Sequence, residues 1–136
     1  MKYPILAFLI AALAFAPAVL AAEVKSETLI ATTRSWDGRL YKPYSTKQPE
    51  LTVIRISIPA HTRLAWHEHP EPNAAYILAG DLIIEKHNGQ RHVVHAGEAV
   101  AETMDTIHRG ITGAKPVVLL AFYAGAKGQP VTVPWP

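Results

Sequence analysis

A two-residue alternation of apolar and polar side chains, which begins at Leu51, constrains the fold of this chain more than any other feature. The stretch LTVIRISI places Ile54, Ile56 and Ile58 on one face and a polar residue such as Arg55 on the other. Side chains of a β-strand alternate between the two faces of a sheet, and β-branched residues favour strands. This stretch is therefore predicted to be a half-buried strand.

More short segments of this kind follow, and turn residues separate them. They are AAYILAG (74–80), DLIIEKH (81–87), AGEAV (96–100), TIHRGIT (106–112) and PVVLLAFYAG (116–125). No helical period is found after the first residues, so the sequence predicts an all-β fold. Closely spaced short strands indicate a sandwich or a barrel, and we expect an antiparallel barrel of six to eight strands.

The Asn-Gly pair at 88–89 is the clearest turn signal in the chain. A two-residue type I′ turn needs positive φ at both central positions, and Asn-Gly is the pair that adopts it most readily. The pair therefore predicts a hairpin between residues 81–87 and 90–95. In a two-residue loop His92 would lie opposite Glu85 as a cross-strand pair.

Residues 1–21 have the features of a secretory signal peptide. Met1 and Lys2 precede a long apolar run, and small residues lead to an expected cleavage after Ala21. An uncleaved membrane anchor is the alternative, because the run approaches spanning length, but Pro17 and the small residues favour cleavage. The mature protein is then expected to be periplasmic or secreted, without contact to a membrane.

The remaining chain divides into an N-terminal arm of residues 22–50, a barrel of residues 51–125 and a C-terminal tail of residues 126–136. One edge strand is expected in the arm, at ETLIAT (27–32), and one in the tail. Arms of this kind often pack across a neighbouring subunit, which is a hint of a homodimer. The sequence has no cysteine, so a hydrophobic core alone must stabilise the domain.

The charge of the chain argues against a nucleic-acid partner. The formal net charge is +2 over 136 residues, and removal of Lys2 with the signal peptide lowers it to about +1. The sequence also lacks a dense stripe of Lys and Arg. We therefore expect no binding of nucleic acid.

Two of the seven histidines are spaced as metal ligands. His67 and His69 are separated by one residue, so a strand would direct both to one face, about 6.5 to 7 Å apart along the chain. Two imidazoles in this arrangement can converge on one cation, with metal–nitrogen distances of about 2.0 to 2.1 Å. Two ligands bind weakly, so a third is needed from another strand, and His108 is the best candidate.

The other four histidines are not expected to be ligands. Three of them surround the predicted hairpin and are interpreted as surface residues: His87, His92 and His95. His61 lies six residues before His67, and the alternation of a continuous strand would direct the two to different faces. We therefore interpret His61 as structural.

The residues around these histidines resemble the two sequence motifs of the cupin family. HEHPEPNAAYILAG is similar to the first motif, G-x5-H-x-H-x3-4-E-x6-G, and GEAVAETMDTIHRGIT is similar to the second, G-x5-P-x-G-x2-H-x3-N. His67, His69 and His108 occupy the three histidine positions. Gly80 and Gly97 occupy two of the glycine positions. The resemblance covers roughly the predicted barrel.

The sequence departs from both motifs. Asn73 stands at the position of the family's glutamate, and Ala60 or His61 stands where the first motif begins with glycine. In the second motif Thr103 replaces the proline, Asp105 the second glycine and Thr112 the asparagine. These departures make the barrel a firmer prediction than the chemistry of its site.

The resemblance implies a small jelly-roll barrel, or double-stranded β-helix, that binds one divalent metal ion, usually Fe, Mn, Zn, Ni or Cu, through three histidines and a glutamate. In this chain Asn73 is expected to support the histidines at the fourth position. Glu71 and Glu102 are alternative sources of a carboxylate, and a site without a fourth protein ligand is also open. Without a carboxylate the ion would keep its full charge and favour an anionic substrate.

The resemblance admits an enzyme, a three-histidine dioxygenase with open metal positions for O2 and a small, partly apolar substrate. Ile77, Ile83 or Phe122 would line the apolar part of its pocket. The alternative is a non-catalytic barrel that binds a small acid or sugar. The resemblance also implies a homodimer.

Overall fold

The computed structural model describes residues 23–136, and the predicted signal peptide, residues 1–21, lies outside them. The described residues form strands and no helix, so the all-β prediction is confirmed. The strands are β1 (Pro49–Ile58), β2 (His67–Glu68), β3 (Asn73–Ala79), β4 (Asp81–Lys86), β5 (Arg91–His95), β6 (Ala99–Ala101), β7 (His108–Thr112), β8 (Val117–Ala126) and β9 (Val133–Pro134). In this part of the chain no helix is long and apolar enough to cross a membrane.

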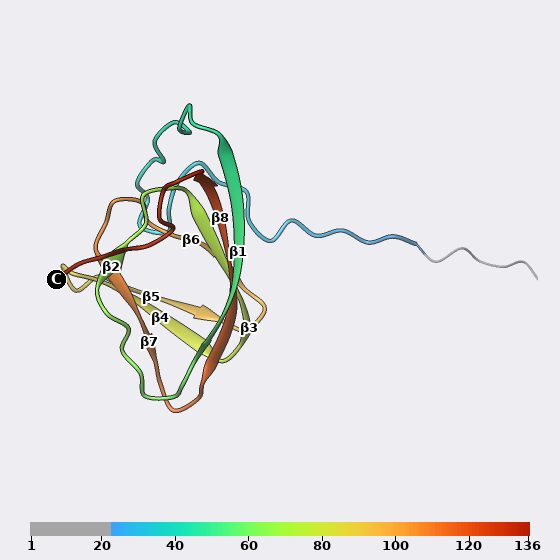
Figure 1. Ribbon diagram of the computed structural model, residues 1–136. Helices are drawn as coiled ribbons and strands as arrows, with labels where there is room; N and C mark the ends of the chain where they lie inside the picture. The colour runs from blue at the N-terminus through green and yellow to red at the C-terminus, as the bar shows by residue number, and fades with distance from the viewer. Residues whose placement is uncertain (1–22) are drawn as a thin grey trace, which may run out of the picture.

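The strands form two antiparallel sheets that face each other across the interior (Figure 1). One sheet has four strands in the order β1-β8-β3-β6, and the other has five in the order β5-β4-β7-β2-β9. Strands that are distant in sequence are therefore neighbours in space, as in the pairing of β1 with β8 along their whole lengths. This arrangement is the expected jelly-roll barrel.

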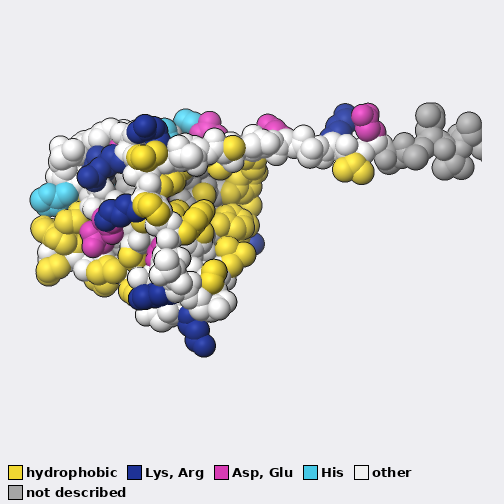
Figure 2. All heavy atoms as spheres, turned by 90° about the horizontal axis from the view of Figure 1, so that it is seen from above, with side chains coloured by type: hydrophobic (Ala, Val, Ile, Leu, Met, Phe, Trp, Pro, Cys, Tyr) yellow, Lys and Arg dark blue, Asp and Glu magenta, His cyan; other side chains and the backbone are white. Residues whose placement is uncertain are grey.

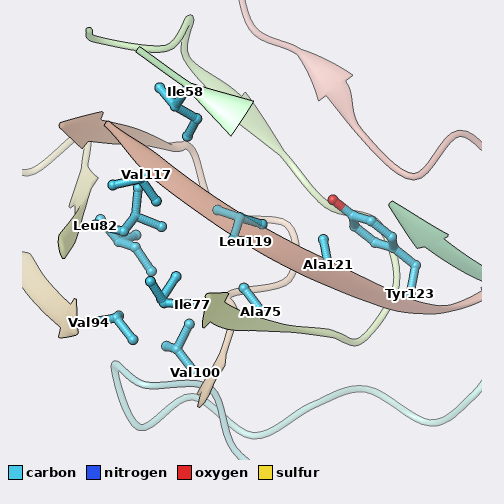
Figure 3. Packing of buried hydrophobic residues seen from close by; sticks show 11 residues of the cluster. Ile58, Ala75, Ile77, Leu82, Val94, Val100, Val117, Leu119, Ala121 and Tyr123 are labelled. Carbon is cyan, nitrogen blue, oxygen red and sulfur yellow. The ribbon is translucent and has the colours of Figure 1, made fainter. Parts of the chain in front are cut away.

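The core lies between the sheets and follows the alternation of the sequence. Every second residue of β8, from Val117 to Tyr123, is buried, and these side chains lie along one face of the strand (Figure 3). Ile77 of β3 and Ile84 of β4 are fully buried opposite them. Burial of one such aliphatic side chain stabilises the fold by about 1.5–3 kcal/mol. The core is therefore the main source of stability in a chain that lacks disulfides.

The hairpin between β4 and β5 forms, but its predicted register is wrong by one residue. Glu85 pairs with Arg91, and His92 pairs with Ile84. Gly89 has a φ of 87° whereas Asn88 is not in the left-handed region, so the loop is not a type I′ turn. Hairpin loops with a single left-handed glycine at their end are longer than the two-residue type I′ turn. The longer loop moves the pairing of β4 with β5 by one residue, so that Arg91 and not His92 lies opposite Glu85.

The arm and the tail both pack on their own barrel. The expected strand at residues 27–32 is absent, and the arm instead forms an isolated bridge between Arg34 and Leu40. Its backbone joins the barrel through a hydrogen bond from Trp36 N to Ala101 O, at 2.9 Å. The tail contains the expected edge strand, β9, which pairs with β2.

Part of the outer face of the four-stranded sheet is apolar. Leu51 and Val53 of β1 and Phe122 of β8 are exposed there, and hydrophobic side chains gather on this side of the molecule (Figure 2). The alternation of β1 explains this face, because its odd-numbered residues point away from the core. Phe122, which was expected to line a pocket, lies on this outer face.

Candidate metal centre

Three histidines meet at one end of the barrel, as the sequence predicts. His67 of β2 lies directly opposite His108 of β7 in the ladder, so their side chains share a face. His69 follows β2 by one residue and returns to the same side. One nitrogen of each ring lies within 4.8 Å of the others. These three residues, His67, His69 and His108, are called the histidine cluster below.

Backbone carbonyl groups hold each ring of the histidine cluster in place. Nδ1 of His67 donates to Ala65 O at 2.8 Å, Nδ1 of His69 to Val131 O at 2.7 Å, and Nδ1 of His108 to Thr106 O at 2.8 Å. Because a carbonyl oxygen can only accept, each Nδ1 must carry the proton and donate it. The Nε2 atoms are then left with lone pairs, which is the arrangement of metal-binding histidines.

A carboxylate lies beside the histidine cluster, and it belongs to Glu102. One of its oxygens is 3.1 Å from Nε2 of His108 and 3.6 Å from Nε2 of His69. Burial would raise the pKa of the Glu102 carboxyl, but hydrogen bonds and charges from His108 and His69 outweigh burial and lower this pKa far below its usual value. Glu102 is therefore an anion at neutral pH.

Asn73 and Glu102 lie side by side on neighbouring strands. Ala74 pairs with Ala101 in the ladder of β3 and β6, and the next pair along it is Asn73 with Glu102, whose backbone N donates to Asn73 O at 3.0 Å. Residues that lie opposite each other place their side chains on the same face of a sheet. The family motif has its glutamate at the position of Asn73, whereas in this chain the carboxylate comes from Glu102, directly across the ladder from Asn73.

The structure does not bring Asn73 or Glu71 to the histidine cluster. The amide of Asn73 donates to Glu71 O at 3.2 Å, and neither side chain lines the cavity that contains the histidines. Glu71 lines a different depression, beside Tyr44 and Lys47. The amide of Asn73 is held toward the loop that precedes β3, which is why it is not among the groups around the cluster.

The protonation of the histidines depends on their neighbours. Burial lowers the pKa of His67, and the nearby rings of the cluster add to this effect. Burial would also lower the pKa of His108, but the hydrogen bond and charge of Glu102 raise it instead. Without a metal ion, Glu102 therefore favours the protonated form of His108, whereas burial favours neutral His67, and a bound cation would take the place of the proton at His108 Nε2.

Both ends of the described chain fix this site. Tyr41 of the arm donates its hydroxyl to Glu102 O at 2.6 Å, and Val131 of the tail accepts from His69. Thr132 lies next to His69 Nδ1 at 3.4 Å. The contacts of Tyr41 and Val131 were not predicted, because their acceptors are backbone oxygens, which every residue type carries. The alternation VTV in the tail indicated a strand but not its partner.

Three departures from the cupin motifs have local explanations. Thr103, at the proline position, is fully buried, and its hydroxyl lies 3.2 Å from His108 Nδ1. Asp105 replaces a glycine and has a φ of 45°, in the left-handed region where Asp is tolerated. Thr112 replaces the asparagine and donates its hydroxyl to Pro59 O at 2.6 Å. The substituted residues thus preserve the local geometry.

A cavity of about 330 Å³ opens from the histidine cluster into the barrel. Its polar side chains are those of the cluster with Glu102, Tyr123 and Thr132. The rest of the lining is mainly apolar and comes from both sheets, and it includes Ile56, Ile58, Leu64, Trp66, Leu82, Ile84, Leu119 and Ala121. Ile77 and Ile83, which were expected to line a pocket, do not line this one.

The arrangement fits a divalent metal ion. In a tetrahedral site with metal–ligand distances of about 2.1 Å, neighbouring ligand atoms lie about 3.4 Å apart. The distances from the Glu102 carboxylate to the two histidine nitrogens, 3.1 and 3.6 Å, bracket this value. Three imidazole nitrogens and one carboxylate oxygen also form a donor set that suits Fe, Mn, Zn, Ni or Cu. The histidine cluster could therefore hold a metal ion.

The fold and the site together define a jelly-roll barrel with a histidine cluster near its mouth. The sequence model of the cupin domain matches residues 54–123, which is half of the chain. The protein therefore belongs to the cupin family, and the resemblance seen in the two motifs is confirmed. No match was found among curated protein sequences.

Solved structures with the same fold are distant in sequence. The DMSP lyase DddQ of Ruegeria pomeroyi is 21% identical with a TM-score of 0.53, and the match covers 59% of this chain and 41% of the lyase. A cupin-like protein of Thermotoga maritima is 14% identical with a TM-score of 0.56, over 62% of this chain and 64% of that one. The polyketide cyclase RemF of Streptomyces resistomycificus is 15% identical with a TM-score of 0.53, over 65% and 62%. These likenesses show the fold alone.

Proposed function

We propose that this protein is an exported cupin that binds one divalent metal ion through the histidine cluster and Glu102, and that it is a metal-dependent oxidoreductase of the dioxygenase type. The observation that carries the proposal is the common orientation of the three histidines, whose Nδ1 atoms all face backbone carbonyls, with an ionised carboxylate beside the Nε2 atoms of His69 and His108. Glu102, one of the two alternative carboxylates, would then take the fourth position at which Asn73 was expected.

The residues of the cavity support chemistry on a small molecule. A bound divalent ion would activate an oxygen donor of the substrate and, if redox-active, would allow both atoms of O2 to be transferred to that substrate. Burial raises the pKa of Tyr123, so its phenol keeps its proton and can donate a hydrogen bond. Glu102 is ionised and accepts one, and the apolar lining excludes water from the reaction.

Metal content tests the proposal directly. The protein without a polyhistidine tag should contain close to one divalent ion per chain by elemental mass spectrometry, either as purified or after reconstitution. His67→Ala should hold the ion more weakly than the parent, because it removes one of the four proposed ligands. A parent protein that binds no metal after reconstitution would refute the proposal.

A pair of variants identifies the fourth ligand. Glu102→Ala removes the carboxylate and should weaken metal binding at least tenfold, since the loss of even an indirect partner of a metal site costs about 10 to 100-fold. Asn73→Ala is the matched control, because it removes a polar side chain of nearly the same length from the neighbouring strand. Equal affinities in the two variants would show that Glu102 is not a ligand.

Oxygen consumption separates catalysis from binding. The metal-loaded protein, screened with small acids, diketones and thiols, should consume O2 with at least one of them. A protein that binds both metal and these compounds without turnover would instead be the non-catalytic module of the alternative interpretation.

Two further parts of the proposal concern location and assembly. Export is proposed on the composition of residues 1–21, which is typical of a signal peptide. A homodimer remains a prediction from the cupin family, and the exposed apolar face of the four-stranded sheet would be a suitable surface for it.

A further inference from the structure

The cavity beside the histidine cluster is polar at one end only. The cluster, Glu102, Tyr123 and Thr132 are all at the metal end, and beyond them the lining is mainly apolar. Leu119, Ala121 and Tyr123 follow one another along β8, with Tyr123 at one end of the row and its hydroxyl turned back toward Ala121 in this view (Figure 3). A molecule that starts at the cluster therefore extends past Ala121, whose small side chain leaves room, toward aliphatic groups.

The apolar part of the cavity is formed by both sheets. Ile56 and Ile58 come from β1, and Leu82 and Ile84 come from β4. These side chains belong to the core or pack against it. A ligand in this position is thus surrounded by aliphatic carbon on two sides, which favours an aliphatic or aromatic body.

The charges of the lining limit the number of anionic groups that a ligand can carry. Within residues 23–136 no Lys or Arg lines the cavity, so a bound metal ion would be its main positive charge. A divalent ion carries two positive charges and Glu102 compensates one of them, so one further anionic group of a ligand would neutralise the site. A second carboxylate at the far end would be buried without a partner, and so would the hydroxyls of a sugar, at a large cost in free energy.

The volume of the cavity sets the size of the ligand. A water molecule occupies about 30 Å³ in the liquid, so 330 Å³ corresponds to roughly eleven waters. A molecule with on the order of ten non-hydrogen atoms fills this space at the packing density of a protein interior.

We infer that the substrate of this site is a small, mainly apolar molecule with a single anionic oxygen or sulfur donor at one end, of the size of a medium-chain carboxylate. This inference rests on the proposed function, because the anionic end is assigned to the metal ion. It narrows the expected ligands: diacids and sugars are excluded, and the far end of the ligand is uncharged.

Calorimetric titration of the zinc-loaded protein tests the inference. Acetate, butyrate and hexanoate should bind with increasing affinity, by about fourfold for each added methylene. Adipate has the same chain length as hexanoate but carries a second carboxylate, and it should bind at least tenfold more weakly. Affinities that do not rise with chain length, or adipate that binds as tightly as hexanoate, would overturn the inference.

Two variants of β1 provide a matched comparison. Ile56→Thr places a hydroxyl in the cavity and should weaken hexanoate binding about fourfold or more while acetate is unaffected. Val53→Thr makes a similar change on the outer face of the same strand and should leave both affinities unchanged. Equal effects of the two variants on hexanoate would contradict the assignment of the apolar body to this cavity.

Failure of the proposed function gives a different result. If the protein takes up no zinc, the metal site is wrong and the carboxylate end is unassigned. The metal-free protein can then be titrated with 1-butanol and 1-hexanol, which report on the apolar cavity alone. If 1-hexanol binds more tightly than 1-butanol, the cavity accepts an apolar body and only the assignment of the anionic end is wrong. If the two alcohols bind equally, both the apolar body and the anionic end are refuted.

Discussion

Gly80 and Gly97 occupy glycine positions of the two cupin motifs, but the structure predicts very different costs for replacing them with alanine. Gly80 joins β3 to β4 with a φ of 78°, and Gly97 precedes β6 with a φ of 88°. An added Cβ at Gly97 meets no atom within 4 Å. An added Cβ at Gly80 would overlap the backbone oxygen of Pro116 and lie 3.1 Å from its carbonyl carbon.

The magnitudes follow from these two environments. A left-handed backbone costs an L-residue about 1–2 kcal/mol, and both variants share this cost. In Gly80→Ala the new Cβ overlaps a backbone oxygen, which cannot rotate away as a side chain can. The turn between β3 and β4 must therefore move away from Pro116, which directly precedes the fully buried Val117. Overpacking of this kind costs about 1–3 kcal/mol more. We therefore expect losses of about 1–2 kcal/mol for Gly97→Ala and about 2–5 kcal/mol for Gly80→Ala.

Urea unfolding of the metal-free proteins, followed by tryptophan fluorescence and by circular dichroism, measures both free energies. The thermal midpoints should fall in the same order, by roughly 4 to 8 °C per kcal/mol for a domain near this size. Similar losses for the two variants, or a larger loss for Gly97→Ala, would refute the reasoning from the Pro116 contact.

Two more predictions concern the arm and the tail. Asp37 of the arm forms a hydrogen-bonded ion pair with Lys86 at 2.6 Å. Burial would raise the pKa of the Asp37 carboxyl, but hydrogen bonds from Lys86 and Ser35 lower this pKa below 3.8. Its stabilising effect is therefore complete above about pH 5 and is lost as the pH falls through the folded pKa. Asp37→Asn should cost about 2 kcal/mol at pH 7, measured by urea unfolding, and this cost should fall steadily as the pH is lowered below 3.8. A cost that does not depend on pH would contradict this. Deletion of residues 131–136 removes the carbonyl that accepts from His69 Nδ1, and it should weaken zinc binding about 10 to 100-fold. The control variant Trp135→Ala keeps that carbonyl and should change the zinc affinity less than threefold. Equal zinc affinity in the deletion variant and the parent would show that the tail does not orient His69.

The strands of this protein could be predicted because each depends on its own sequence. The alternation at 51–58 fixes which residues of β1 face the core, and the apolar run at 116–125 predicts β8. The register of the hairpin could not be predicted in the same way. It depends on the φ of a single residue, Asn88, which is not positive although an Asn-Gly pair favours a positive value.

The candidate site was predicted in part for a similar reason. The spacing of His67 and His69 is a property of one strand, and His108 follows from the second motif. The carboxylate is different. The sequence names Glu102 only as one alternative beside Asn73 and Glu71, because its place at the site depends on how the end of β6 pairs with β3. A motif that is read along one strand cannot choose between candidates on different strands.

The shortness of β9 has a consequence for how the site exchanges with solvent. This strand pairs with β2 through two residues, so it can separate from the barrel at a much lower free energy than global unfolding requires. Separation would release the Val131 carbonyl from His69 and remove Thr132 and Pro134 from the wall of the cavity. Entry and departure of an ion or ligand would then be timed by the opening of a single short strand, while the two sheets stay folded.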